Sequence, residues 1–395
     1  MSVGASICLA AVLLCASAAT ADPSRYVLLN LTPGSDRAPA LAKMRADAPT
    51  GGDVAVGFAV IVSYLNQPLA RAEAELRACL HQAESNNLPL VVQLDGEQWW
   101  DGRPDLWNWW DPGKPGYDPA NRQTVEWTGW GPEYAVRIAW RNWGRQIRVL
   151  PPPNLMAPRY RAACHEAMAR LVPVILDWWH GLPPERRWLF AGLKLGWESS
   201  IGVNAFHYPG GNALADRPEA EDPKGGIDPD VLPARGVAGL GYAAVTTAGI
   251  ATSGEMREEW LTEVVRRHLE DLCRQAAELG VPRDHLFTHC GGWHQGETLY
   301  GAALNRWSCP GWSFYRYAAD PAADKSAMAA WSGSDAPYWG AVEWLAGGGR
   351  EQWRQALRTV LALPRLRYVG VFNWSDMEKY PVQWAGLLDA VRAPN

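Results

Sequence analysis

The chain has no cluster of basic residues. Its 395 residues include 37 Lys and Arg against 42 Asp and Glu, which gives a formal net charge of -5. Nucleic-acid binding needs grouped Lys and Arg to neutralise phosphates, so we expect no nucleic-acid partner. After the N-terminal residues, no apolar run is long enough to cross a bilayer, and we expect no membrane partner either. The oligomeric state is left open.

Several cofactor and catalytic motifs are also missing. The chain contains neither G-x-G-x-x-G nor G-x-x-x-x-G-K, the glycine patterns that cradle the phosphates of bound nucleotides. It has no G-x-S-x-G motif for a serine nucleophile and no C-x-x-C pair. We therefore expect no cofactor and no metal, and chemistry carried by ordinary side chains.

Two of the seven cysteines fall within an N-terminal leader, and the other five are scattered. For a domain of this size we expect one or two disulfides and at least one unpaired thiol. Ile7–Ala18 is an apolar run too short to span a bilayer, and the small residues Ala19–Ala21 follow it, although no Lys or Arg precedes it. Residues 1–21 are predicted to be a signal peptide. The mature chain, residues 22–395, would be a single secreted or periplasmic domain.

Tryptophan is abundant, with 23 residues in the chain. Nine lie between Trp99 and Trp143, and five of these stand among Asp, Asn, Gly and Pro in a loop-like stretch, namely Trp99, Trp100, Trp107, Trp109 and Trp110. Loops run over the surface, and an exposed indole offers a flat face to the apolar side of a sugar ring. The pattern therefore favours a carbohydrate ligand.

Short apolar runs alternate with amphipathic segments along the chain. The predicted strands are Tyr26–Leu29, Val54–Val62, Leu88–Leu94, Trp188–Leu195, His285–His289, Tyr338–Val342 and Tyr368–Phe372. The predicted helices are Arg71–Ser85, Tyr160–Trp179 with an interruption at Pro173, Met256–Leu279, Glu351–Leu361 and Gln383–Val391. Alternation of this kind predicts parallel strands covered by helices. Polar residues follow many different strands, which favours an α/β fold of the (β/α)8 TIM-barrel type.

One strand of such a barrel is missing from this list. We expect it to be the fifth, near Val237–Val245, although that stretch could equally be helical. Two long insertions stand out, Trp99–Pro153 after strand three and Ser199–Arg235 after strand four. Both would lie on the rim that carries the active site of such barrels.

Two carboxylates end apolar strands in this chain. Glu198 follows the fourth predicted strand beside Trp197, whose indole would desolvate a general acid, and Glu343 follows Tyr338–Val342. A charge at the end of so apolar a strand is costly unless it is paired or functional, and Lys194 and Arg350 are the alternative ion-pair partners. Cleavage of a glycosidic bond needs two carboxyl groups on opposite sides of the sugar. Glu198 and Glu343 are therefore the candidate catalytic pair.

These segments resemble the retaining (β/α)8 glycoside hydrolases of clan A, which carry an acid/base Glu after strand four and a nucleophilic Glu after strand seven. Val369–Asp376 (VGVFNWSD) is similar to the eighth strand of that clan and ends in its aromatic-Trp-Ser pattern at Trp374. The chain departs from the clan at Trp197, where the clan usually has Asn. The resemblance implies a retaining glycosidase acting on a β-linked glycan, with Glu198 as acid/base and Glu343 as nucleophile.

Other side chains are predicted to bind the oligo- or polysaccharide substrate, which the absence of an Arg cluster indicates is neutral. These are Gln93, Asp95, Glu97, Trp99, Trp197, Asn204, His207, Tyr208, His289, Trp293, Trp344 and Trp374. Asp95 and Glu97 are also the first candidates to replace one member of the pair. Two other functions remain open: a non-catalytic carbohydrate-binding barrel, and a metal-dependent hydrolase using His289, His294 and Glu297. An inverting mechanism is open too.

Overall fold

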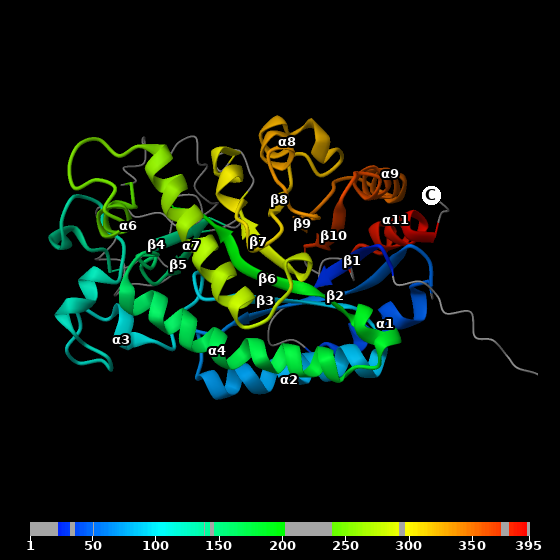
Figure 1. Ribbon diagram of the computed structural model, residues 1–395, viewed down its shortest axis with the longest axis horizontal. Coiled ribbons are helices and arrows are strands. Elements are labelled where there is room, and N and C mark those ends of the chain that lie inside the picture. Colours follow the sequence, from blue (N-terminus) through cyan, green and yellow to red (C-terminus); the bar gives the residue numbers. More distant parts are fainter. Residues whose placement is uncertain are drawn as a thin grey trace, which may run out of the picture.

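A computed structural model describes residues 23–31, 36–49, 51–137, 139–142, 146–201, 239–291, 297–372 and 379–392. Parallel strands close into a barrel in the order β1-β10-β9-β8-β7-β6-β3-β2 (Figure 1). Their bounds are β1 (Arg25–Asn30), β2 (Val54–Ser63), β3 (Leu90–Asp95), β6 (Phe190–Ser199), β7 (Leu286–Cys290), β8 (Gly311–Phe314), β9 (Trp339–Trp344) and β10 (Leu366–Val371). The chain is thus a (β/α)8 TIM barrel, as the sequence predicts.

Helices cover the outside of the barrel. They are α1 (Ala38–Asp47), α2 (Leu69–Asn86), α4 (Pro158–Gly181), α7 (Glu258–Glu278), α8 (Lys325–Ser332), α9 (Arg350–Leu361) and α11 (Pro381–Arg392). The predicted interruption at Pro173 is wrong, because α4 continues through it. A proline inside a helix costs about 3 kcal/mol. The flanking residues Leu171, Val172 and Ile175 are fully buried against the barrel, and their burial offsets that cost.

The missing strand is the sixth of the barrel rather than the fifth. It is β8, whose sequence Gly-Trp-Ser-Phe is too short and too poor in β-branched residues to give a strand pattern. In the stretch expected to hold the fifth strand, the described residues instead form helix α6 (Tyr242–Thr247). His289 consequently lies on the fifth strand, β7.

The insertion after β3 carries secondary structure of its own. It contains α3 (Pro104–Trp107) and an antiparallel hairpin of β4 (Ala139–Asn142) and β5 (Gln146–Val149). Figure 1 shows these elements gathered with α6 at one end of the molecule, away from α9 and α11. The buried carboxylate of Glu126 accepts a hydrogen bond from the Gly241 backbone N–H at 3.0 Å and so ties the insertion to α6. Most of the insertion after β6 lies outside the described residues.

The expectation of disulfides is wrong. Cys79, Cys164, Cys273, Cys290 and Cys309 all lie in the described part of the chain, are buried, and form no disulfide. Three of them lie on helices α2, α4 and α7, one lies on β7, and Cys309 precedes β8. Among the described residues, no helix is both long enough and apolar enough to cross a membrane.

The barrel interior changes character along its axis. An apolar cluster fills one part of it, with Tyr26, Leu28, Val91, Phe287, Val342 and Tyr368 among its members. Toward the carboxyl ends of the strands the buried side chains become polar, and include Gln93, Lys194, Glu198, His289, Ser313 and Glu343. A buried polar group is costly unless it is paired or has a function, so this layer is the place to look for chemistry.

Candidate active site

Glu198 lies inside β6, at a local distortion of the strand. The pairing of β6 with β7 shifts register between Leu195 and Ser199, and Gly196 and Glu198 have positive φ angles of 83° and 50°. A Cβ at Gly196 would come within 2.3 Å of the Ser199 hydroxyl oxygen, so glycine is needed for this turn of the chain. The carboxyl of Glu198 is buried, and its Oε1 accepts a hydrogen bond from the Ser313 hydroxyl at 3.0 Å.

Glu343 lies inside β9, beside a second distortion. Trp312 of β8 pairs with Ala341, whereas Ser313 pairs with Glu343, so Val342 is an extra residue that makes a β-bulge. The Glu343 carboxylate is 1% exposed and accepts a hydrogen bond from the Tyr315 hydroxyl at 2.7 Å. Arg350, the ion-pair partner considered from the sequence, binds Asp389 instead, at 2.6 Å.

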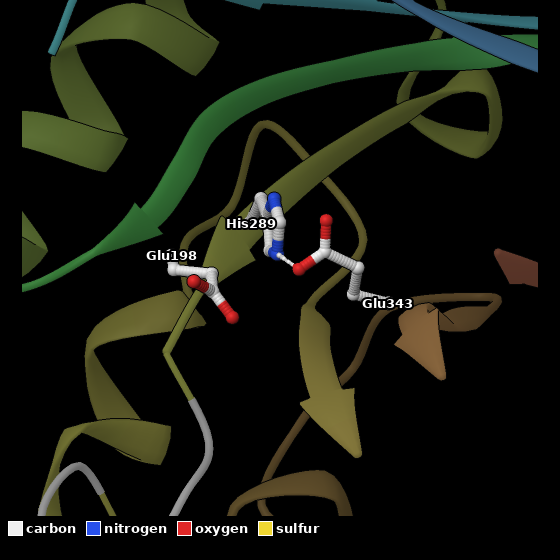
Figure 2. A group of neighbouring side chains, drawn as sticks. All are labelled: Glu198, His289 and Glu343. Carbon is white, nitrogen blue, oxygen red and sulfur yellow. Dashed lines mark ion pairs between the residues drawn. The ribbon is translucent and has the colours of Figure 1, made fainter. Parts of the chain in front are cut away.

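The two carboxylates and His289 converge on one point. One oxygen of Glu198, one oxygen of Glu343 and one ring nitrogen of His289 all lie within 4.8 Å of one another. Figure 2 shows the imidazole between the two carboxylates, with its Nε2 at 3.8 Å from Glu343 Oε2. The barrel therefore brings together the pair that the sequence predicts, at the carboxyl ends of its strands.

His289 is neutral in this setting. Burial, together with the positive charge of Lys194, holds the pKa of the imidazole well below its ordinary value. Its Nε2 lies 3.0 Å from the Ser313 hydroxyl, which also contacts Glu198. While Glu198 is ionised it can only accept, so Ser313 donates to it and must accept from Nε2–H. When Glu198 is protonated, the direction of both hydrogen bonds can reverse.

Ser313 and Tyr315 are site residues that the sequence analysis missed. Burial and the negative charges of Glu343 and Glu198 raise the pKa of the Tyr315 hydroxyl well above its ordinary value, so it remains a donor. Both residues belong to or directly follow β8, the strand that was not recognised. The sequence did carry a signal: the polar Ser313 stands within the short run Gly311–Phe314, and Tyr315 follows that run directly.

The three converging groups also match the donor types that metal ions use, two carboxylates and one imidazole. This set differs from the metal candidate of the sequence, His289 with His294 and Glu297. Of that candidate, His294 and the side chain of Glu297 lie outside the described residues.

Asp95 and Glu97 are buried and make internal hydrogen bonds. Asp95 Oδ1 accepts the backbone N–H groups of Glu97 and Gln98, and its Oδ2 accepts the Ser63 hydroxyl at 2.9 Å. Burial raises the pKa of Asp95 to about 6. Glu97 Oε1 meets the Ser199 hydroxyl at 2.6 Å and His268 Nε2 at 2.9 Å. These contacts hold the β3 loop against β6 and α7, and the sugar-binding or catalytic roles of Asp95 and Glu97 remain predictions.

Gln93 lies closer to the pair. Its amide donates to the Gly196 carbonyl at 3.0 Å, across the strand distortion that carries Glu198. Its side chain is fully buried, and its Oε1 has no hydrogen-bond partner among the described residues.

The tryptophans divide between packing and the surface. Trp344 is fully buried, donates to the Ala318 carbonyl at 2.7 Å and packs edge-on against Trp353 of α9, so it faces the helical layer instead of a sugar. Trp100, expected on the surface, is 2% exposed and bonds the Pro151 carbonyl. Trp107 and Trp109 are partly buried and pack on the core. Trp99 and Trp197 are partly exposed.

Five further predicted residues cannot be placed. Asn204, His207, Tyr208, Trp293 and Trp374 lie outside the described residues.

The sequence matches no protein-family model, and no curated protein matches it. Similar solved structures include a GH5-4 broad-specificity endoglucanase from an uncultured bacterium, at 9% identity, covering 95% of this chain and 96% of that one, with a TM-score of 0.46. The catalytic domain of a β-amylase from Paenibacillus polymyxa is 10% identical, with 93% of this chain and 99% of that chain covered and a TM-score of 0.46. A mannanase from Bacillus subtilis is 9% identical, with 94% of this chain and 84% of that chain covered and a TM-score of 0.46. These three structures are of glycoside hydrolases, and no family is assigned to this chain.

Proposed function

We propose that the protein is a retaining glycoside hydrolase. The observation that carries the proposal is the approach of two buried carboxylates, Glu198 and Glu343, to within 4.8 Å at the carboxyl ends of the barrel strands. Retaining enzymes hold their two carboxyl groups about 5–5.5 Å apart, whereas inverting enzymes need about 6.5–9.5 Å to admit a water molecule. An oxygen of each carboxylate lies within 4.8 Å of an oxygen of the other, and this close approach supports retention.

The hydrogen bonds support a division of roles. The Tyr315 hydroxyl donates to Glu343 Oε2 at 2.7 Å and also bonds Glu198, so it can stabilise negative charge on the proposed nucleophile and on its partner. Glu198 meets the Ser313 hydroxyl, which can donate or accept and therefore suits a carboxyl that gains and loses a proton. In the proposed reaction Glu198 protonates the glycosidic oxygen while Glu343 attacks the anomeric carbon and forms an ester. Water, deprotonated by Glu198, then hydrolyses that ester and restores both groups.

The proposed substrate is a neutral, β-linked oligo- or polysaccharide. The β-linkage rests on the clan A resemblance of the segments around Glu198, Glu343 and Trp374. A neutral glycan fits a chain that has no Arg cluster in its sequence. No cofactor enters the mechanism.

A covalent label tests the proposal. A panel of dinitrophenyl 2-deoxy-2-fluoro-β-glycosides should leave one sugar attached, and peptide mass spectrometry should place it on Glu343. Glu343→Gln should prevent labelling and turnover, and Glu198→Gln should lower turnover of poor leaving groups most. Glu126→Gln is the matched control, because Glu126 is also buried but lies in the insertion. Full activity in Glu343→Gln would refute the proposal.

The same variants separate the two other functions. A non-catalytic carbohydrate-binding barrel would bind glycans in both Glu→Gln variants and never show turnover in the wild type. A metal-dependent hydrolase is the second candidate, favoured by the convergence of Glu198, His289 and Glu343. It would lose activity with a chelator and regain it with zinc, whereas the two-carboxylate mechanism is indifferent to both treatments.

Export is a further proposal. Its support is the apolar run Ile7–Ala18 followed by Ala19–Ala21, residues that lie outside the described part of the chain. Expression of the full chain in a bacterium should yield a secreted or periplasmic protein that begins at Asp22. Recovery of the intact chain from the cytoplasm would contradict it.

A further inference from the structure

Lys194 is a lysine buried inside the barrel. It belongs to β6 and is 1% exposed, and its Nζ donates to the Val342 carbonyl at 3.3 Å. In the barrel, β7 and β8 separate β6 from β9, so the side chain crosses the interior to reach the backbone of β9. A buried ammonium is costly unless it is paired or has a function.

The carbonyl that Lys194 contacts belongs to the bulge beside Glu343. Val342 is the extra residue of β9 where its pairing with β8 shifts register. On the neighbouring strand β10, a Cβ at Gly370 would come within 2.3 Å of the Val342 carbonyl oxygen. Glycine at that position leaves space for the carbonyl, and Lys194 binds it. Lys194 of β6 and Gly370 of β10 thus fix the position of the backbone immediately before Glu343.

The charges around Lys194 come from the catalytic layer. Burial lowers the pKa of the Lys194 ammonium to about 8, while the negative charges of Glu343 and Glu198 act in the opposite direction. Other titratable groups among the described residues of this interior are His289 of β7, which is neutral, Tyr26 of β1, Tyr315 after β8 and Tyr368 of β10. Burial raises the pKa of Tyr315 and Tyr368 well above the ordinary value. At neutral pH Lys194 is therefore mainly cationic and faces two carboxylates.

We propose that Lys194 is a positioning residue of the catalytic pair, which fixes the bulge that aims Glu343 and supplies a constant positive charge during the reaction. The inference rests on the proposed glycosidase function. Before attack, Glu343 carries the negative charge and Glu198 the proton. In the glycosyl-enzyme, Glu343 is a neutral ester and Glu198 carries the charge. Lys194 balances one negative charge in both states, so the buried site stays neutral throughout the cycle.

The test compares variants that remove the charge with variants that disturb only the geometry. Lys194→Met should lower kcat/KM about 100-fold and move the acidic limb of its pH profile up by about one unit, because an ionised carboxylate loses its cation. Gly370→Ala should lower kcat by displacing the Val342 carbonyl, with the acidic limb in place because the charge is retained. Val91→Ala, a packing change in the same interior, should lower the melting temperature alone.

The outcomes distinguish this inference from the proposed function. An unmoved acidic limb in folded Lys194→Met would overturn the role of the charge, and wild-type kcat in Gly370→Ala would overturn the role of the bulge. If Lys194→Met does not fold, Lys194→Arg provides the test: it should keep the acidic limb in place, and a displaced limb would count against the inference. Activity that survives Glu343→Gln would instead refute the proposed function.

Discussion

Tyr315→Phe removes one hydroxyl from the site and leaves the ring. That hydroxyl donates to Glu343 Oε2 at 2.7 Å, in a region buried enough to keep it protonated. A hydrogen bond to a charged group contributes about 1.5–3 kcal/mol. Since about 1.4 kcal/mol corresponds to one pH unit, its loss should move the acidic limb of kcat/KM up by about one to two units. At a pH on that limb, the variant should be about 10- to 100-fold slower.

The assay is the pH dependence of kcat/KM on an activated aryl β-glycoside, together with the rate of covalent labelling. Tyr160→Phe is the matched control, because its buried hydroxyl bonds the Gly96 carbonyl at 3.1 Å, away from the pair. The control should lose stability and keep its acidic limb. If Tyr315→Phe is slower at every pH with the limb unmoved, the hydroxyl does not stabilise the ionised nucleophile and the reasoning fails.

Three further predictions concern other parts of the chain. Ser313→Ala should slow substrates with poor leaving groups about 10-fold or more and spare dinitrophenyl glycosides, because acid catalysis by Glu198 loses its hydroxyl partner; equal losses on both substrates would contradict this. Burial raises the pKa of Glu126 from 4.5 to about 8, so its contribution to stability is present below pH 4.5 and lost as pH rises through 8. Denaturation at pH 5 and pH 9 should therefore show a smaller loss of stability in Glu126→Gln than in wild type. Trp344→Phe should lower the free energy of unfolding by about 1–3 kcal/mol and leave KM unchanged. A raised KM would instead indicate that Trp344 contacts the substrate.

The barrel could be predicted because most of its strands are long apolar runs. Val54–Ser63 is buried along nearly its whole length, and such strands carry their signal in composition. The four residues of β8 carry too little pattern, and that omission hid Ser313 and Tyr315 as well. Glu198 and Glu343 were found because a carboxylate at the end of a buried strand is costly. Their partners come from other strands, and contacts across a barrel leave no periodicity in the sequence.

The same logic did not reveal the partners of Asp95, Glu97 and Trp344. A polar residue after a strand and a tryptophan near a carboxylate have the same local signature whether they face the substrate or the protein. Glu97 binds His268 of α7, which is 171 positions away, so only the fold could reveal its partner. Trp344 follows Glu343 directly, yet it packs against Trp353 of α9 in the helical layer.

The backbone conformation at Glu198 lowers the stability of the folded protein. Its φ of 50° lies in the left-handed region, which a side chain other than glycine occupies at a cost of about 1–2 kcal/mol. Its carboxyl is also buried, and this burial lowers the stability of the folded protein further. A chain selected for folding alone would exchange this residue for glycine or asparagine and become more stable. The proposed acid/base thus stands at a site where stability and activity make opposite demands, and replacing Glu198 should yield a less active protein that resists heat better.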